Sequence, residues 1–204
     1  QQMAEVSSED GGRTSDTIYS DSWLRLRQEV SESELPFCDL YAVREVFKSI
    51  PSNASLHLGN SSCVRHAQLF PLNDGVRVYC NRGTHGIDGC MSTAVGYAAA
   101  SDTLTYLLIG DLSFFYDLNA LWNRHVSSKL RVILTNNGGA GIFQYNLGKK
   151  GLQTLDYNIA AEHGTSAKGW VESLGYMYLS ARNKTELSRC LPELAREDVG
   201  TPII

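Results

Sequence analysis

Two short apolar runs, at residues 103–109 and 130–135, most restrict how this chain can fold. Each run is rich in aliphatic and β-branched residues and ends at a loop containing glycine or asparagine, which is typical of strands buried on both faces. A segment with helical spacing, residues 118–125, lies between them. A strand–helix–strand order of this length predicts parallel strands joined by a crossover helix.

The same alternation extends over most of the chain. Further strands are expected at residues 54–58, 76–80 and 176–179, and one more strand is expected to begin at residues 202–204. Further helices are expected at residues 36–50, 61–69, 88–100, 166–174 and 184–195. The predicted fold class is therefore α/β, with a parallel β-sheet flanked by helices on both faces.

The predicted domain covers residues 35–204, and we expect it to be truncated at its C-terminus. Residues 1–34 are interpreted as a linker or the end of a preceding domain, because the first twenty are polar and only Trp23, Leu24, Leu26 and Val30 suggest one face of a short helix.

Charge excludes some classes of partner. The net charge is −4, but residues 1–36 hold eight acidic and three basic residues, so the remainder is nearly neutral. No basic stripe suggests nucleic-acid binding, and no apolar stretch suggests membrane insertion.

The number and spacing of the cysteines favour reduced thiols and a cytoplasmic location. They are odd in number and lack CxxC spacing. The five cysteines are Cys38, Cys63, Cys80, Cys90 and Cys190.

Three glycine- or asparagine-rich loops follow consecutive predicted strands, at residues 81–89, 110–113 and 136–141. In parallel sheets the loops at the carboxyl ends of strands form the ligand site, and glycine lets the backbone approach a ligand closely. Neither a GxxxxGK[ST] phosphate loop nor a GxGxxG dinucleotide motif is present. The loops therefore predict a ligand site of another kind.

Asp111 and Asn137 end neighbouring predicted strands. Carboxylate, amide and main-chain carbonyl oxygens are hard ligands suited to Mg²⁺ or Ca²⁺. Free amides around residues 110–113 and the N-terminus of a following helix can receive phosphate oxygens. The pair therefore predicts a site for a metal–diphosphate.

The loops carry a family resemblance. Gly110-Asp111 followed by Asn136-Asn137 resembles the GDG…NN signature of thiamine diphosphate enzymes. The combined segments 81–89, 110–119 and 136–143, together with Gly59-Asn60-Ser61, resemble the diphosphate-binding domain of the 2-succinyl-5-enolpyruvyl-6-hydroxy-3-cyclohexene-1-carboxylate synthase family of menaquinone biosynthesis. Leu112 replaces the third glycine, as in the narrower family.

The resemblance implies a role for each matching residue. Asp111, Asn137 and the Gly139 carbonyl would ligate Mg²⁺ or Mn²⁺, and Gly110, Leu112 and Ser113 would lie near the diphosphate. Ile87 would bend the cofactor, and Ile142 and Phe143 would line its thiazolium ring. Without the resemblance, ordinary core packing would account for these three. The substrate carboxylates would contact Ser61, Arg65 and Arg82, while His85 has no assigned role.

The resemblance also implies substrates and partners. In this family 2-oxoglutarate is decarboxylated and the resulting succinyl carbanion adds to isochorismate. The activating glutamate lies on a pyrimidine-binding domain of a second subunit, within a homodimer or homotetramer. We therefore expect this chain alone to be inactive. Two alternatives stay open: another thiamine diphosphate decarboxylase or carboligase such as an acetolactate synthase, and a non-catalytic metal- or nucleotide-binding α/β domain.

Overall fold

The computed structural model describes residues 15–143 and 153–204. The chain divides into two compact units, Gln1–Glu34 and Leu35–Ile204. In the first unit, α1 (Ser15–Glu32) forms 18 residues of α-helix, so helix begins within the stretch that was predicted as polar linker. Its apolar side chains Tyr19, Trp23, Leu24 and Leu26 are exposed.

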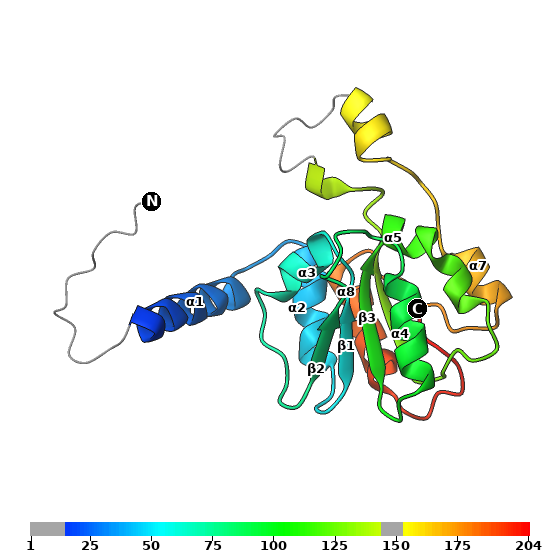
Figure 1. Ribbon diagram of the computed structural model, residues 1–204, viewed down its shortest axis with the longest axis horizontal. Helices are drawn as coiled ribbons and strands as arrows, with labels where there is room; N and C mark the ends of the chain where they lie inside the picture. Colours follow the sequence, from blue (N-terminus) through cyan, green and yellow to red (C-terminus); the bar gives the residue numbers. More distant parts are fainter. Residues whose placement is uncertain (1–14, 144–152) are drawn as a thin grey trace. The chain divides into compact units, whose positions relative to one another are not determined.

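The second unit is built on a four-stranded parallel sheet (Figure 1), in the order β2-β1-β3-β4. Its strands are β1 (Ser55–Leu58), β2 (Arg77–Cys80), β3 (Thr105–Gly110) and β4 (Leu130–Thr135). Parallel pairing holds throughout, which confirms the predicted α/β class. The chain changes direction across the sheet between β1 and β3, and this switch point is where parallel sheets bind ligands.

Helices cover both faces of the sheet (Figure 1). The helical elements of this unit are α2 (Asp39–Ser49), α3 (Ser62–Ala67), α4 (Cys90–Ala99), α5 (Asp111–Tyr116), α7 (Lys168–Ser173) and α8 (Lys184–Ala195), a 3-10 turn η1 (Leu118–Leu121) and a π-helical turn η2 (Leu155–Ile159).

The main core lies between the sheet and α4. Leu107, Ile109 and Val132 face this helix and pack with its buried Met91 and Ala94. The opposite face meets α2 and α8, where the Tyr106 hydroxyl donates to the Leu194 carbonyl at 2.9 Å. Burial on both faces explains why β3 and most of β4 are apolar in the sequence.

Side chains fix the starts of two helices. Asn183 precedes α8 and accepts a hydrogen bond from the Glu186 amide at 2.9 Å, while the Glu186 carboxylate accepts from the Arg182 amide at 2.7 Å. This reciprocal capping explains why α8 begins at the predicted residue. At α4, the buried Asp117 carboxylate accepts from the Ser92 amide at 2.7 Å and the Ser92 hydroxyl at 2.6 Å.

The structure corrects the prediction at four places. Helix α5 starts at Asp111 itself, so residues 110–113 are not an open turn. The helix predicted at 118–125 is only the short turn η1. The strands predicted at 176–179 and 202–204 are reduced to isolated bridges of Ile203 with Arg131 and Met177. Turn η2 lies in a stretch that was expected to be irregular.

Candidate functional site

A cavity of about 770 Å³ lies at the carboxyl end of the sheet. It is lined from the ends of β1, β3 and β4 and from the loop after β2. Every residue predicted for the site lines this one cavity: Ser61, Arg65, Arg82, Ile87, Gly110, Asp111, Leu112, Ser113, Asn137, Gly139, Ile142 and Phe143. The structure thus brings the predicted residues together, while the role of each stays a prediction.

Asp111 is the central charged group of the cavity and is only 3% exposed. Its Oδ2 accepts hydrogen bonds from the amides of Gly138 and Gly139, both at 2.8 Å, and its Oδ1 accepts from the Leu112 amide at 2.7 Å. A carboxylate at the first position of a helix is also stabilised by the helix dipole. These contacts hold a buried anion in one orientation.

The loop after β4 needs glycine where it meets Asp111. Gly138 and Gly139 have φ values of 88° and 143°, which other residues rarely adopt. A Cβ on Gly139 would also lie 2.6 Å from the Ala160 carbonyl oxygen. The Gly139 carbonyl accepts from the Gly141 amide at 2.9 Å, and a carbonyl oxygen retains a second lone pair for a ligand.

A residue that does not line the cavity, Asp39, determines the orientation of the Asn137 side-chain amide. Its Nδ2 donates to Asp39 Oδ2 at 2.7 Å. An ionised carboxylate can accept hydrogen bonds but cannot donate them. The nitrogen of the Asn137 amide must therefore face Asp39, and its oxygen must face away. No protein donor to that oxygen occurs among the described residues, and it is available as a ligand.

The loop after β2 is held by a buried amide. Asn60 is 3% exposed, and its Nδ2 donates to the carbonyls of Asn81, Thr84 and Gly86. The Ser113 hydroxyl donates to the Ile87 carbonyl, which ties the loop to α5. These contacts place Ile87, half-buried, on the cavity wall.

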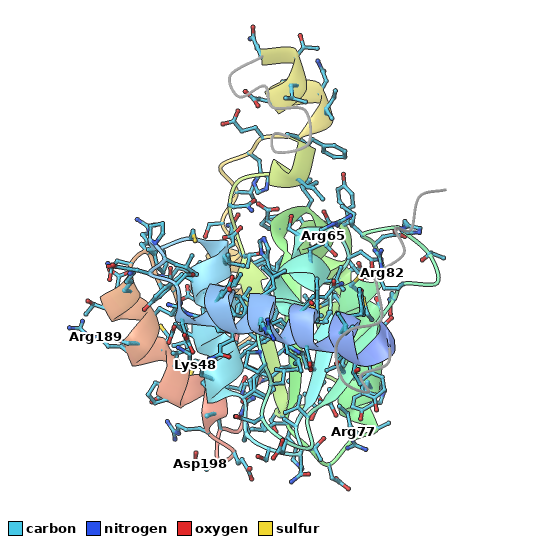
Figure 2. All side chains as sticks on the ribbon, turned by 90° about the vertical axis from the view of Figure 1, so that its left-hand side faces the viewer. Lys48, Arg65, Arg77, Arg82, Arg189 and Asp198 are labelled. Atoms are coloured by element: carbon cyan, nitrogen blue, oxygen red, sulfur yellow. The ribbon has the colours of Figure 1, made fainter. Side chains whose placement is uncertain are left out.

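Ser61 carries backbone strain at the edge of the cavity. Its φ is 70°, a conformation that costs a non-glycine residue about 1–3 kcal/mol and that concentrates at ligand sites. The Ser61 carbonyl accepts from Arg65 Nη1 at 2.8 Å. Arg65 and Arg82 are exposed and lie at the same end of the domain (Figure 2), whereas Arg77 lies at the opposite end.

Apolar groups line the remaining wall. Leu112, Ile142 and Phe143 contribute here, and Phe143 is 40% exposed. Tyr116 also lines the cavity and is 62% exposed, although the sequence did not single it out. Large apolar groups this exposed at a cavity favour an occupant that covers them.

Two further lining residues have no chemistry assigned. Cys63 is buried, and burial raises the pKa of its thiol to about 12, which makes it a poor nucleophile. His85 is exposed and lines the cavity, and nothing in the structure gives it a role.

The donor set suits a small hard cation. Asp111, Asn137 and the Gly139 carbonyl all line the cavity and offer oxygen atoms, which Mg²⁺ prefers. No cluster of three or more His, Cys, Asp or Glu side chains exists within the described ranges. The proposed donors are instead one carboxylate, one side-chain amide and one main-chain carbonyl, and their oxygen atoms fit Mg²⁺ or Mn²⁺.

Three residues of the site's surroundings were not among the predicted site residues. Asn60 anchors the loop after β2, Asp39 contacts Asn137, and His163 lies 3.3 Å from Asp111. Asn60 appeared only as part of the Gly59-Asn60-Ser61 resemblance. Asp39 and His163 gave no local signal, because they lie far from the motifs in sequence.

The fold and cavity together define an α/β domain consistent with thiamine diphosphate binding. The chain is similar to 2-succinyl-5-enolpyruvyl-6-hydroxy-3-cyclohexene-1-carboxylate synthases of several bacteria. It is 44% identical to the Bacteroides fragilis protein over 187 residues, covering 91% of this chain and 34% of that protein. Identity to the Phocaeicola vulgatus protein is 41% over 175 residues, covering 86% of this chain and 31% of that protein.

A more distant relative, the same synthase of Flavobacterium johnsoniae, is 36% identical over 189 residues, covering 93% of this chain and 34% of that protein. No protein-family model matches the chain. The resemblance stated from the sequence is confirmed: this chain is a homologue of part of these synthases. It spans about a third of the length of the curated relatives it matches.

Proposed function

We propose that this chain is the diphosphate- and metal-binding domain of a thiamine diphosphate-dependent transferase of menaquinone biosynthesis. The full enzyme would decarboxylate 2-oxoglutarate and join the remaining four carbons to isochorismate. The observation that carries the proposal is the convergence of Asp111, Asn137 and Gly139 on one cavity in a chain whose relatives carry the synthase name.

In this proposal the chain's own groups bind and orient. Asp111 Oδ1, the Asn137 oxygen and the Gly139 carbonyl would hold the cation, and Leu112 and Ser113 would lie near the diphosphate. When bound, thiamine diphosphate supplies the carbon-centred nucleophile chemistry. Ile87 would bend the cofactor, and Ile142 and Phe143 would line its thiazolium ring and exclude water beside it, which strengthens electrostatic interactions within the site.

Two guanidinium groups suit substrates that carry two carboxylates. Arg65 and Arg82 line the cavity and are exposed, and a guanidinium binds a carboxylate through two parallel hydrogen bonds. Ser61, at the strained start of α3, would add a hydroxyl. The bond of Arg65 to the Ser61 carbonyl keeps its guanidinium near the cavity.

Replacing Arg65 or Arg82 with alanine in the full-length enzyme is expected to raise KM for 2-oxoglutarate or isochorismate by about 10- to 100-fold. A charge-assisted hydrogen bond contributes roughly 1.5–3 kcal/mol. Steady-state kinetics with each substrate varied in turn measures the effect. Arg77→Ala is the matched control, because Arg77 is exposed on β2 at the far end of the domain (Figure 2). Unchanged KM in both test variants would refute the carboxylate contacts.

The site on this chain is half of an active site in the proposed enzyme. The activating glutamate would come from the pyrimidine-binding domain of a second subunit in a homodimer or homotetramer. The exposed Tyr116 and Phe143 at the cavity are surfaces that such a domain would cover.

The purified chain is accordingly expected to show no synthase turnover with thiamine diphosphate, Mg²⁺, 2-oxoglutarate and isochorismate. The spectrophotometric consumption of isochorismate measures this, with a full-length enzyme as the positive control. Substantial turnover by the chain alone would contradict the assignment of the activating group to another domain.

The cytoplasm is the proposed location. All cysteines of the chain are free, as expected in a reducing compartment. Among the described residues, no helix has the length and apolar character needed to cross a membrane.

A further inference from the structure

Two side chains outside the predicted set contact the two side chains that would ligate the cation. Asp39, at the first position of α2, accepts from Asn137 Nδ2 at 2.7 Å. His163, in the segment after η2, places Nε2 3.3 Å from Asp111 Oδ2. Neither contact is local in sequence, so each depends on the completed fold.

The Asp39 contact decides which atom of Asn137 faces the cavity. An amide side chain can rotate to exchange its oxygen and nitrogen, and hydrogen-bond partners determine which orientation is stable. Because the Asp39 carboxylate only accepts hydrogen bonds, it binds the amide nitrogen of Asn137. The amide oxygen of Asn137 then faces the cation site. A rotated Asn137 would place oxygen against oxygen at Asp39 and present an N–H to the cation.

His163 acts on the other ligand. Its Nδ1 accepts a hydrogen bond from the Thr165 amide at 3.1 Å, so a neutral ring carries its proton on Nε2. Nε2 is buried and has no hydrogen-bond partner within the described structure, and it lies beside Asp111 Oδ2. The ring is held in place by an edge-to-face contact with Phe115, at 5.4 Å between centroids.

Backbone amides distinguish the two oxygens of Asp111, and His163 lies on the Oδ2 side. Oδ2 accepts hydrogen bonds from two backbone amides and lies beside His163 Nε2, whereas among the described residues Oδ1 accepts only from the Leu112 amide. A carboxylate oxygen offers about two acceptor directions. Oδ1 therefore retains a free direction for a cation, and Oδ2 does not.

We propose that Asp39 and His163 are positioning residues that orient Asn137 and Asp111 for cation binding. The inference rests on the proposed function, since it assumes that these two residues are metal ligands. Groups that orient metal ligands typically change metal affinity by about 10- to 100-fold when they are removed.

The test uses a full-length polypeptide containing this chain and measures Mn²⁺ affinity at saturating thiamine diphosphate, from the electron paramagnetic resonance signal of free Mn²⁺. Asp39→Leu and His163→Phe remove the polar contact and keep comparable bulk. Asp39→Asn keeps an acceptor oxygen and His163→Gln keeps a side-chain N–H. Asp74→Leu, at an exposed carboxylate away from the cavity, is the matched control.

The expected result is about 10- to 100-fold weaker Mn²⁺ binding by Asp39→Leu and His163→Phe, with most of the affinity recovered in Asp39→Asn and His163→Gln. Melting temperatures without metal and cofactor should match the wild type. Wild-type affinity in Asp39→Leu and His163→Phe, in the same assay in which Asp111→Ala loses Mn²⁺, would overturn the positioning role and leave the proposed function intact.

Two other outcomes also overturn it. If Asp39→Leu and His163→Phe lowered the melting temperature as well as the Mn²⁺ affinity, and the conservative variants recovered neither, both residues would have a purely structural role. Failure of the wild-type polypeptide to bind Mn²⁺ with thiamine diphosphate would overturn the proposed function itself, and the positioning role with it.

Discussion

Replacing Asp111 with alanine is expected to lower the affinity for Mg²⁺ and thiamine diphosphate by at least about 100-fold, equivalent to about 2.7 kcal/mol. Asp111 is the one carboxylate of the proposed ligand set, and it is buried, where water screens its charge poorly. The alanine side chain also releases the amides of Gly138 and Gly139. Isothermal titration of a full-length polypeptide with thiamine diphosphate, with and without Mg²⁺, measures the loss.

A second buried carboxylate provides the matched control for Asp111. Asp117 also accepts a backbone amide, at the start of α4, but it does not line the cavity. Asp111→Asn and Asp117→Asn remove one negative charge each and keep the size of the side chain. Both are expected to lower the melting temperature, and only Asp111→Asn should weaken Mg²⁺-dependent binding. Retained affinity in both Asp111 variants would refute the metal assignment.

Much of the fold was predictable because the central strands β1 and β3 and the first half of β4 are buried. The runs at 103–109 and 130–135 are rich in aliphatic and β-branched residues and became β3 and β4. The capped helix at 184–195 was predicted at the bounds it has, since Asn183 and Glu186 act within one turn. Local interactions and burial alone decide such elements, and both are visible in the sequence.

The segment after β3 was predicted wrongly for a physical reason. Gly110 suggested a turn, but its φ of −81° and ψ of 163° are those of an extended strand residue, and α5 begins at the next residue, Asp111. The Asp111 carboxylate accepts from Leu112, Gly138 and Gly139, so the helix start is stabilised partly by the loop after β4. The local sequence pattern around residue 111 cannot predict an interaction with a loop 27 residues away.

The same limit applies within the site. The Asp111 and Asn137 site followed from the motifs, because parallel strands end at one edge of the sheet, and the other predicted lining residues followed from the family resemblance. Asp39, by contrast, lies 98 positions from Asn137, and no spacing rule connects them. The positioning groups could be found only from the folded chain.

Arg131 shows how far a buried strand can depart from an apolar pattern. This residue of β4 is fully buried, and its guanidinium donates to the carbonyls of Leu194 at 3.1 Å, Ser128 at 2.7 Å, Leu130 at 3.0 Å and Arg196 at 2.5 Å. The first and last of these carbonyls lie at the C-terminal end of α8, where a cation also complements the helix dipole. Burial lowers the pKa of Arg131, and the nearby Tyr106 opposes that shift.

Replacing Arg131 with methionine is therefore expected to lower the free energy of unfolding by about 3 kcal/mol, because a charge-assisted hydrogen bond contributes roughly 1.5–3 kcal/mol and the carbonyls it leaves behind stay buried. The loss is smaller than the sum of four bonds, since removing the guanidinium also removes its cost of burial. Urea unfolding of the purified chain, followed by circular dichroism, measures the change. Arg189→Met is the matched control, because Arg189 is an exposed arginine of α8 (Figure 2), and surface changes usually stay within about 0.5 kcal/mol. Equal stability of the two variants would show that burial of the Arg131 charge costs as much as its four hydrogen bonds contribute, and that the end of α8 needs no cation.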